Sequence, residues 1–151
     1  MLDQSLRKAC ENIEIGGGPF GAVIVNEEGE IIAEAGNSVT SDFDPTAHAE
    51  VNAIRIACKK LGKFTLDNCV LYSSCEPCAM CMGAIYWSHL SKVYYASTRS
   101  DAALANFDDK FIYEEFNIEA EKRKIPGIYL NVKEGTSPFE KWVSKENKVP
   151  Y

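Results

Sequence analysis

Three cysteines lie within seven residues in the stretch SSCEPCAMC, residues 73–81. Cys75, Cys78 and Cys81 form a C-x-x-C-x-x-C run, and Pro77 stands just before the second of them. Proline suits the first position of a helix, because the amide hydrogen that it lacks would be unpaired there. We therefore expect a helix over CAMCMGAIYW, with two of the thiols on one face of its first turn. This place favours a metal site, because the helix dipole stabilises the thiolate form that binds metals.

A second motif upstream, DPTAHAE at residues 44–50, places His48 two residues before Glu50. Both side chains can reach a site beyond the start of a helix, because side chains lean towards the helix N-terminus. The order H-x-E and then P-C-x-x-C is the signature of the zinc-dependent nucleobase deaminases. His48, Cys78 and Cys81 would leave the fourth position of a zinc ion for water, whose pKa the ion lowers to near neutrality. Glu50 is the predicted general base.

Other uses of the cysteines remain open at this point. A fourth thiol, from Cys75 or elsewhere, would close the site into a structural zinc centre. The C-x-x-C-x-x-C run also resembles part of a ferredoxin motif, but Ile85 occupies the position where that motif needs a Cys-Pro pair. We expect Cys75 to be a buried neighbour of the site, and the remaining thiols to be core residues in apolar settings. These are Cys10, Cys58 and Cys69.

The composition is that of one globular domain covering residues 1–151, with 46% hydrophobic and 25% charged residues. No apolar run approaches the roughly 18 residues that a membrane span needs, so no membrane partner is expected. The mixed, charged N-terminus does not resemble a secretory signal, and six cysteines then favour metal binding or burial in a cytoplasmic protein. The net charge of −6 argues against a nucleic-acid partner.

Apolar spacing predicts a helix, a hairpin, and then strands that alternate with helices. Helices are expected over residues 1–14, 45–61 with Asp44 as N-cap, about 77–87, 99–118 and 138–146; strands are expected over 20–25, 31–35, 70–72, 93–95 and 128–132. This order predicts an α/β fold, a three-layer α/β/α arrangement with a mixed five-stranded sheet. The stretch GGGPFG matches G-x-G-x-x-G, but it precedes a strand and opens no helix, so we interpret it as a tight turn.

Several further motifs accompany the zinc pattern: GGPFGAVIV, SCEPCAMC-x-GAIYW, FDD followed by FIY, SPF-x-x-W and a terminal tyrosine. Together they resemble the cytidine-deaminase-like superfamily along most of the chain, and within it the small bacterial guanine deaminases. The resemblance implies hydrolysis of guanine to xanthine and ammonia, with one Zn²⁺ per chain. It also implies a homodimer in which a C-terminal segment, about 137–151, crosses over and Tyr151 caps the partner's active site.

The resemblance implies contacts to the purine as well. Asn37 and the backbone of Ala49 would hydrogen-bond the ring, and Phe20 would stack on it. Trp87 would help to wall the pocket. Asp109, the second acid of FDD, would contact the ring and help to move protons towards the departing amine.

Three other functions remain open from the sequence. A tRNA adenosine deaminase shares DPTAHAE, the hairpin and E-P-C-x-M-C, but it needs a basic surface and a site open to a flipped nucleotide. A cytosine or cytidine deaminase fits as well, since the zinc site is indifferent to the ring. A zinc- or cluster-binding module without catalysis is the third. The acidic balance and the terminal segment favour the guanine deaminase interpretation over the first of these.

Overall fold

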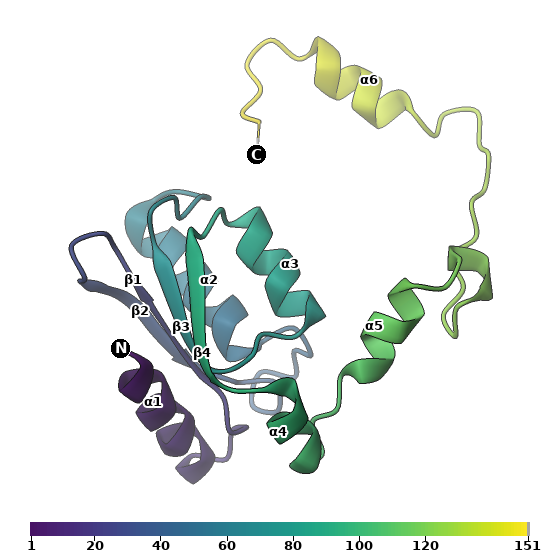
Figure 1. The fold of residues 1–151 in the computed structure, drawn as a ribbon. Helices are drawn as coiled ribbons and strands as arrows, with labels where there is room; N and C mark the ends of the chain where they lie inside the picture. Colours follow the sequence, from purple (N-terminus) through teal and green to yellow (C-terminus); the bar gives the residue numbers. More distant parts are fainter. Residues whose placement is uncertain (151) are drawn as a thin grey trace. The chain divides into compact units, whose positions relative to one another are not determined.

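A mixed sheet of four strands forms the centre of the first part of the chain (Figure 1). The strands lie in the order β2-β1-β3-β4, and their bounds are Gly21–Val25 for β1, Ile31–Gly36 for β2, Val70–Cys75 for β3 and Lys92–Ser97 for β4. Strand β1 pairs antiparallel with both β2 and β3, whereas β3 and β4 are parallel. The predicted hairpin and the predicted mixed sheet are therefore confirmed.

Helices cover both faces of this sheet and make three layers. Helix α1 (Leu2–Glu14) packs on β1 and β3, and α2 (Ala49–Leu61) packs on β2, β1 and α3 (Ala79–Trp87). Figure 1 shows α1 on one face and α2 and α3 on the other. Helix α1 approaches β1 so closely that a Cβ at Gly21 would lie 2.4 Å from the carbonyl oxygen of Ser5. Only glycine fits at that position without a shift of the backbone.

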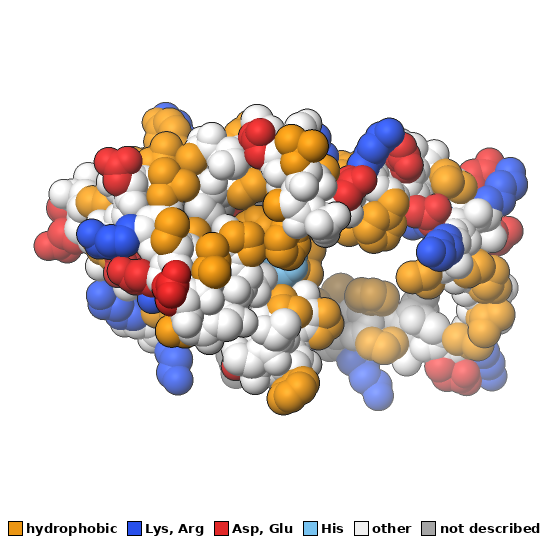
Figure 2. All heavy atoms as spheres, turned by 90° about the horizontal axis from the view of Figure 1, so that it is seen from below, with side chains coloured by type: hydrophobic (Ala, Val, Ile, Leu, Met, Phe, Trp, Pro, Cys, Tyr) orange, Lys and Arg blue, Asp and Glu red, His pale blue; other side chains and the backbone are white. Residues whose placement is uncertain are grey.

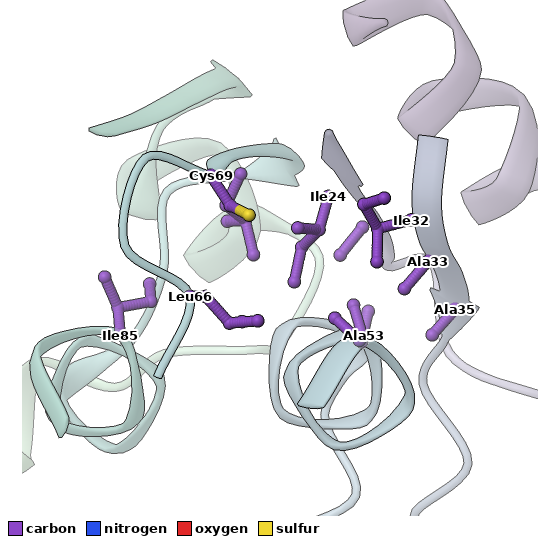
Figure 3. Packing of buried hydrophobic residues seen from close by; sticks show 12 residues of the cluster. Ile24, Ile32, Ala33, Ala35, Ala53, Leu66, Cys69 and Ile85 are labelled. Atoms are coloured by element: carbon purple, nitrogen blue, oxygen red, sulfur yellow. The ribbon is translucent and has the colours of Figure 1, made fainter. Parts of the chain in front are cut away.

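The core fills the layer between the sheet and α2 (Figure 3). Ile24 and Leu71 come from the sheet, Ala53 from α2 and Leu66 from the loop before β3, and none of these is more than 1% exposed. A fully buried isoleucine or leucine side chain, such as Ile24, Leu66 or Leu71, contributes about 1.5–3 kcal/mol to folding. The alanines of α2 let the helix lie close to the sheet, which fixes the start of α2 relative to the strands.

The chain divides into two compact units, Met1–Phe111 and Ile112–Tyr151, and the computed structural model describes residues 1–150. The boundary lies within α5 (Lys110–Phe116). The second unit also holds a 3₁₀ turn, Ala120–Lys122, and α6 (Ser137–Ser144). None of the helices within residues 1–150 has the length and the apolar character needed to cross a lipid bilayer.

The fifth strand, predicted over residues 128–132, is wrong: the sheet has four strands. Ile128, Tyr129 and Leu130 are 62%, 82% and 71% exposed, and this run pairs with no strand of the described chain. Its β-branched and aromatic residues fit a strand, but a strand also requires an edge to pair with. Propensity alone could not show whether the chain supplies that edge.

The helix expected over residues 99–118 is interrupted. Helix α4 (Arg99–Leu104) begins with a capping box of Thr98 and Asp101, and ends before Asn106, which has a φ of 68°. The carboxylate of Asp108 accepts a hydrogen bond from the Lys110 amide at the start of α5, 2.9 Å away. The FDD motif is therefore a turn between two short helices, because Asp108 binds a backbone amide that a continuous helix would use.

The helices predicted to begin at Pro45 and Pro77 begin four and two residues later. Helix α2 begins at Ala49 with His48 as N-cap, and α3 begins at Ala79 with Cys78 as N-cap. Asp44 does not cap α2, because its Oδ1 accepts the amide of Thr46 at 2.8 Å and the hydroxyl of the same residue at 2.7 Å. This local turn competes with helix formation in the first residues of the motif.

The buried face of α1 is made of small and polar residues. Ser5, Ala9 and Asn12 are its buried residues, whereas the side chain of Cys10 is exposed, so its placement in the core was wrong. Small and polar residues line this face because the sheet lies so close to the helix. Among the other thiols expected in the core, Cys69 is buried and Cys58 is half-buried.

Candidate active site

Two helix N-termini meet at one cluster of three ligand atoms. His48 is the N-cap of α2, Cys78 is the N-cap of α3, and Cys81 lies in the first turn of α3. The Nδ1 atom of His48 is 3.6 Å from the Cys78 sulfur and 3.5 Å from the Cys81 sulfur, and the two sulfurs are 3.6 Å apart. Within residues 1–150, no other group of three His, Cys, Asp or Glu side chains is close enough to hold a metal ion.

This triangle fits a zinc ion. With Zn–S bonds of about 2.3 Å and Zn–N bonds of about 2.0–2.1 Å, tetrahedral ligand atoms lie about 3.5–3.8 Å apart. The three observed separations agree with these values. Cys81 is buried, whereas His48 and Cys78 are half-buried, so one side of the cluster faces outwards. Three protein ligands with an open side are typical of a catalytic rather than a closed structural zinc site.

The charges of the cluster favour metal binding. Hydrogen bonding from Cys81 and from His48 lowers the pKa of the Cys78 thiol to about 4, against the effect of burial. The pKa of Cys81 is raised, chiefly by its hydrogen bond with Cys78 and by burial, as expected when one proton lies between two sulfurs. The Cys78 sulfur also raises the pKa of His48. A divalent cation would replace the shared protons and neutralise the thiolates.

Glu50 lies beside the sulfurs, in the first turn of α2. Its side chain is buried, its Oε1 accepts a hydrogen bond from the hydroxyl of Ser73 at 3.1 Å, and its Oε2 lies 3.4 Å from the Cys81 sulfur. Burial raises the pKa of Glu50. A carboxyl group with a raised pKa, fixed by two contacts, can both accept and return a proton near neutral pH.

Cys75 is close to the cluster in sequence but belongs to β3. It is buried, and its thiol donates a hydrogen bond to the carbonyl oxygen of Thr98 at 3.5 Å. Burial raises its pKa to about 11. It is not among the three residues whose ligand atoms come together, so the structure does not support a fourth sulfur ligand.

Zinc-free protein should therefore react with iodoacetamide at Cys78 at least about tenfold faster than at Cys75, even at pH 6, because only the former is a thiolate there. Added zinc should suppress this reaction. Peptide mass spectrometry after timed labelling measures both rates, with the exposed Cys10 as an internal reference for an accessible thiol. Equal rates at Cys75 and Cys78 would contradict the assignment of the thiolate.

The residues proposed to bind the ring lie together at the edge of β1 and β2. A Cβ at Gly18 would lie 3.4 Å from the Oδ1 of Asn37 and 3.5 Å from the ring of Phe20, so both side chains lie next to this glycine. Phe107 of the FDD motif packs edge-on against Phe20, with ring centroids 5.0 Å apart. Within residues 1–150, the side-chain nitrogen of Asn37 has no hydrogen-bond partner and can serve a ligand.

Ala49 and Asp109 lie near the metal cluster. Ala49 is fully buried between the two motif residues His48 and Glu50, at the first position of α2. Asp109 is half-buried, and burial raises its pKa, with the charge of Cys78 acting in the same direction. The turn at FDD therefore brings an acid close enough to the cluster to sense the thiolate.

Two expected residues are not placed at the site. Trp87 ends α3, about 13 Å along the helix from Cys78, and its side chain is 70% exposed. Its role in the wall of the pocket remains a prediction. Tyr151 lies outside the described residues.

Sequence reasoning missed Ser73 and Phe107. Ser73 sits on β3, and its partner Glu50 is 23 positions away in sequence. Phe107 belongs to FDD, whose two acids alone were considered. A polar residue in a buried strand two positions before a metal-binding loop was the available signal for Ser73.

Comparison with known proteins agrees with this geometry. Residues 1–97 match the family described as the cytidine and deoxycytidylate deaminase zinc-binding region. The guanine deaminase of Bacillus subtilis (strain 168) is 54% identical over 99% of this chain and 96% of its own length. The X-ray structure of a guanine deaminase from Bacillus subtilis superposes with a TM-score of 0.97, at 54% identity and with the same coverage. The chain belongs to the guanine deaminases of the cytidine deaminase family.

Other members of the family match this chain over a smaller part of its length. The tRNA-specific adenosine deaminase of Aquifex aeolicus is 47% identical over 96 residues, 64% of this chain and 63% of its own. The guanine deaminase from Nitrosomonas europaea has a TM-score of 0.68 and 33% identity, and the match covers 71% of this chain and 62% of that one. Solved chains with the same TM-score are in complex with 8-azaguanine or with 2,6-diaminopurine.

Proposed function

We propose that this chain hydrolyses guanine to xanthine and ammonia. The observation that carries the proposal is the extent of the likeness to the Bacillus subtilis guanine deaminase, which continues through the second unit to the end of the chain. The match to the tRNA-specific adenosine deaminase covers 96 residues only. The purine analogues bound by other relatives support a purine ring as the substrate.

The metal site fits a single zinc ion per chain, held by His48, Cys78 and Cys81. When bound, zinc would act as a Lewis acid and lower the pKa of water towards neutrality. Glu50 accepts the proton of the attacking water, because its buried carboxyl group lies beside the Cys81 sulfur. Since its pKa is raised, Glu50 can then deliver that proton to a ring nitrogen. The second proton of the water, on the hydroxyl group now bound to C2, then passes through Glu50 to the departing amine, as the C2–N bond breaks and the C2=O bond forms.

The ring of guanine lies, in this proposal, between the side chains of Phe20 and Asn37. Phe20 stacks on the ring, and its edge-on contact with Phe107 keeps the phenyl plane in place. Asn37 and the backbone of Ala49 hydrogen-bond the polar edge of the purine. Asp109 contacts the ring and helps to protonate the amine, since its raised pKa allows it to carry a proton closer to neutral pH than an exposed acid does.

We extend the proposal to a homodimer in which the C-terminal segment closes the partner's site. Within the second unit, Ile125, Tyr129 and Leu130 are 84%, 82% and 71% exposed, more apolar surface than a monomer keeps in one short run. Tyr151 would then cap the site of the partner subunit. Trp87, whose side chain is 70% exposed in the single chain, would help to wall the pocket. A single-chain mass in sedimentation equilibrium would contradict the dimer.

Hydrophobic side chains are spread over the face shown in Figure 2, and a histidine side chain lies recessed among them. A recessed polar group with an apolar surround suits a small, flat base better than a charged polymer. The proposed reaction would serve purine metabolism. We place the protein in the cytoplasm, because all six cysteines are free and a reducing compartment preserves free thiols.

The decisive test is ammonia release from zinc-loaded protein offered guanine, adenine, cytosine, guanosine and cytidine in parallel. We expect release from guanine alone. Release from another base would retain the metal chemistry and overturn the pocket around Asn37 and Phe20. If no free base released ammonia, the proposal would be overturned and tRNA would be favoured as the substrate. A salt-sensitive gel shift with tRNA would then show binding of the nucleic acid.

A further inference from the structure

A buried asparagine on α1, Asn12, joins the helix to the two segments that carry the ring-binding residues. Its side chain is 6% exposed, and its Nδ2 donates one hydrogen bond to the carbonyl oxygen of Gly18 and another to that of Asn37, each 2.8 Å long. Both hydrogens of the amide are therefore used. From this geometry we infer that Asn12 is a positioning residue for purine binding, acting through Asn37 and Phe20.

The surroundings of Asn12 are built to its shape. A Cβ at Gly17 would lie 2.3 Å from the Asn12 Nδ2, and a Cβ at Gly36 would lie 2.3 Å from the Asn12 Oδ1. Two glycines thus allow two backbone segments to close over the amide from both sides. A side chain shorter than asparagine leaves this space empty, and a longer one does not fit.

The two hydrogen bonds hold parts of the chain that must keep a fixed separation. Gly18 lies two residues before Phe20, and the carbonyl accepted at the other end belongs to Asn37 itself. The backbone amide of Asn37 in turn donates to the carbonyl oxygen of Phe20 at 3.2 Å. The Asn12 amide and this backbone hydrogen bond together hold the stacking ring and the hydrogen-bonding side chain at a fixed separation. The inference rests on the proposed function, in which Phe20 and Asn37 bind the purine.

Asn37 is held from the other side by α2. The Nδ2 of Asn52 donates to the carbonyl oxygen of Gly36 at 3.1 Å and to the hydroxyl of Ser38 at 2.9 Å, the residues on either side of Asn37. The side-chain Oδ1 of Asn37 accepts the amide of Val39 at 3.2 Å. Asn12 adds the hydrogen bonds that link Asn37 to Gly18, in the glycine-rich turn before β1.

The test is steady-state kinetics of Asn12→Asp and Asn12→Ala in the zinc-loaded full chain. Aspartate keeps the size of the side chain but cannot donate to two carbonyl groups, and alanine removes both donors. We expect the KM for guanine to rise about tenfold in each variant, as for the loss of one oriented hydrogen bond to a ligand, while kcat changes less than about threefold. Zinc content should match that of the wild type, because no metal ligand touches Asn12.

Ser5→Ala is the matched control. Ser5 lies on the same buried face of α1, but its hydroxyl donates within the helix, to the carbonyl oxygen of Leu2 at 2.7 Å. It should leave the KM unchanged even where it lowers the melting temperature. KM does not depend on the fraction of active protein, so partial unfolding of a variant cannot imitate the expected result. Asn12→Ser, which keeps one donor, should give an intermediate KM.

Three outcomes would overturn the inference. One is an unchanged KM in folded Asn12→Asp and Asn12→Ala; another is a parallel fall of kcat and zinc content; the third is failure of every Asn12 variant to fold, which would show a purely structural role. The proposed function is tested separately by the wild type. If the wild type deaminates a different base, the proposed function and its pocket fail, whereas an unchanged KM in the variants of a wild type that deaminates guanine overturns this inference alone.

Discussion

Replacing Glu50 by glutamine should lower kcat for guanine by about a thousandfold while the zinc content stays at the wild-type value. General acid–base groups contribute about 10²–10⁴ to rates, and the amide can neither accept nor return the protons that the reaction moves. The change preserves the shape of a side chain that is 5% exposed. It also leaves the hydroxyl of Ser73 with an acceptor, so the fold around the cluster should remain intact.

Glu76→Gln is the matched control for this variant. Glu76 is also an acid near the ligands, one residue before Pro77, but it pairs with Arg99 at 3.2 Å and has no contact with the cluster. Its neutralisation should change kcat less than about threefold, since partly exposed ion pairs contribute little. Metal analysis and single-turnover rates on both variants measure the difference. Near-normal turnover of Glu50→Gln would contradict the role of Glu50 as proton carrier.

The metal cluster could be predicted because its information is local. His48 and Glu50 are two residues apart, Cys78 and Cys81 are three apart, and each pair stands at a helix start. A motif of this kind fixes which atoms come together even when the bounds of the helices are wrong by a few residues. The β1–β2 hairpin followed in the same way from two short hydrophobic runs and the turn between them.

The ligands themselves explain why both helix starts were misplaced. Proline and aspartate upstream are the usual signals of a helix start, but His48 and Cys78 occupy the N-cap positions, and neither side chain caps its own helix. Both side chains instead turn towards the other helix, where their donor atoms meet. At these two N-cap positions, the site has a metal-ligand side chain in place of a capping side chain. Propensity rules cannot anticipate this exchange.

The support of the ring-binding residues could not be predicted from sequence, because it depends on contacts between distant segments. Asn12 and Asn37 are 25 positions apart, and Phe20 meets Phe107 across most of the first unit. On α1 the large apolar residues Leu6 and Ile13 are 38% and 51% exposed, whereas a polar amide is buried. Such contacts follow from the close approach of α1 to the sheet, which the glycines permit.

Removal of one ligand should abolish zinc binding and activity together. In Cys78→Ala the cluster loses the thiol whose pKa is lowered to about 4, and the two remaining donors cannot hold the ion in a three-ligand site. We expect bound zinc to fall well below one ion per chain after dialysis, and kcat/KM to fall by more than about a thousandfold.

Cys75→Ala is the control that separates ligation from the mere loss of a thiol. Cys75 lies three residues earlier and is buried, but its hydrogen bond goes to the Thr98 carbonyl and its pKa is raised to about 11. It should keep its zinc and most of its activity, with a lower melting temperature because a small cavity forms in the core. Zinc analysis, guanine turnover and thermal melting on both variants decide the point. If Cys75→Ala loses zinc as readily as Cys78→Ala does, the site has four protein ligands, no position remains for water, and the chain is a structural zinc protein instead of a hydrolase.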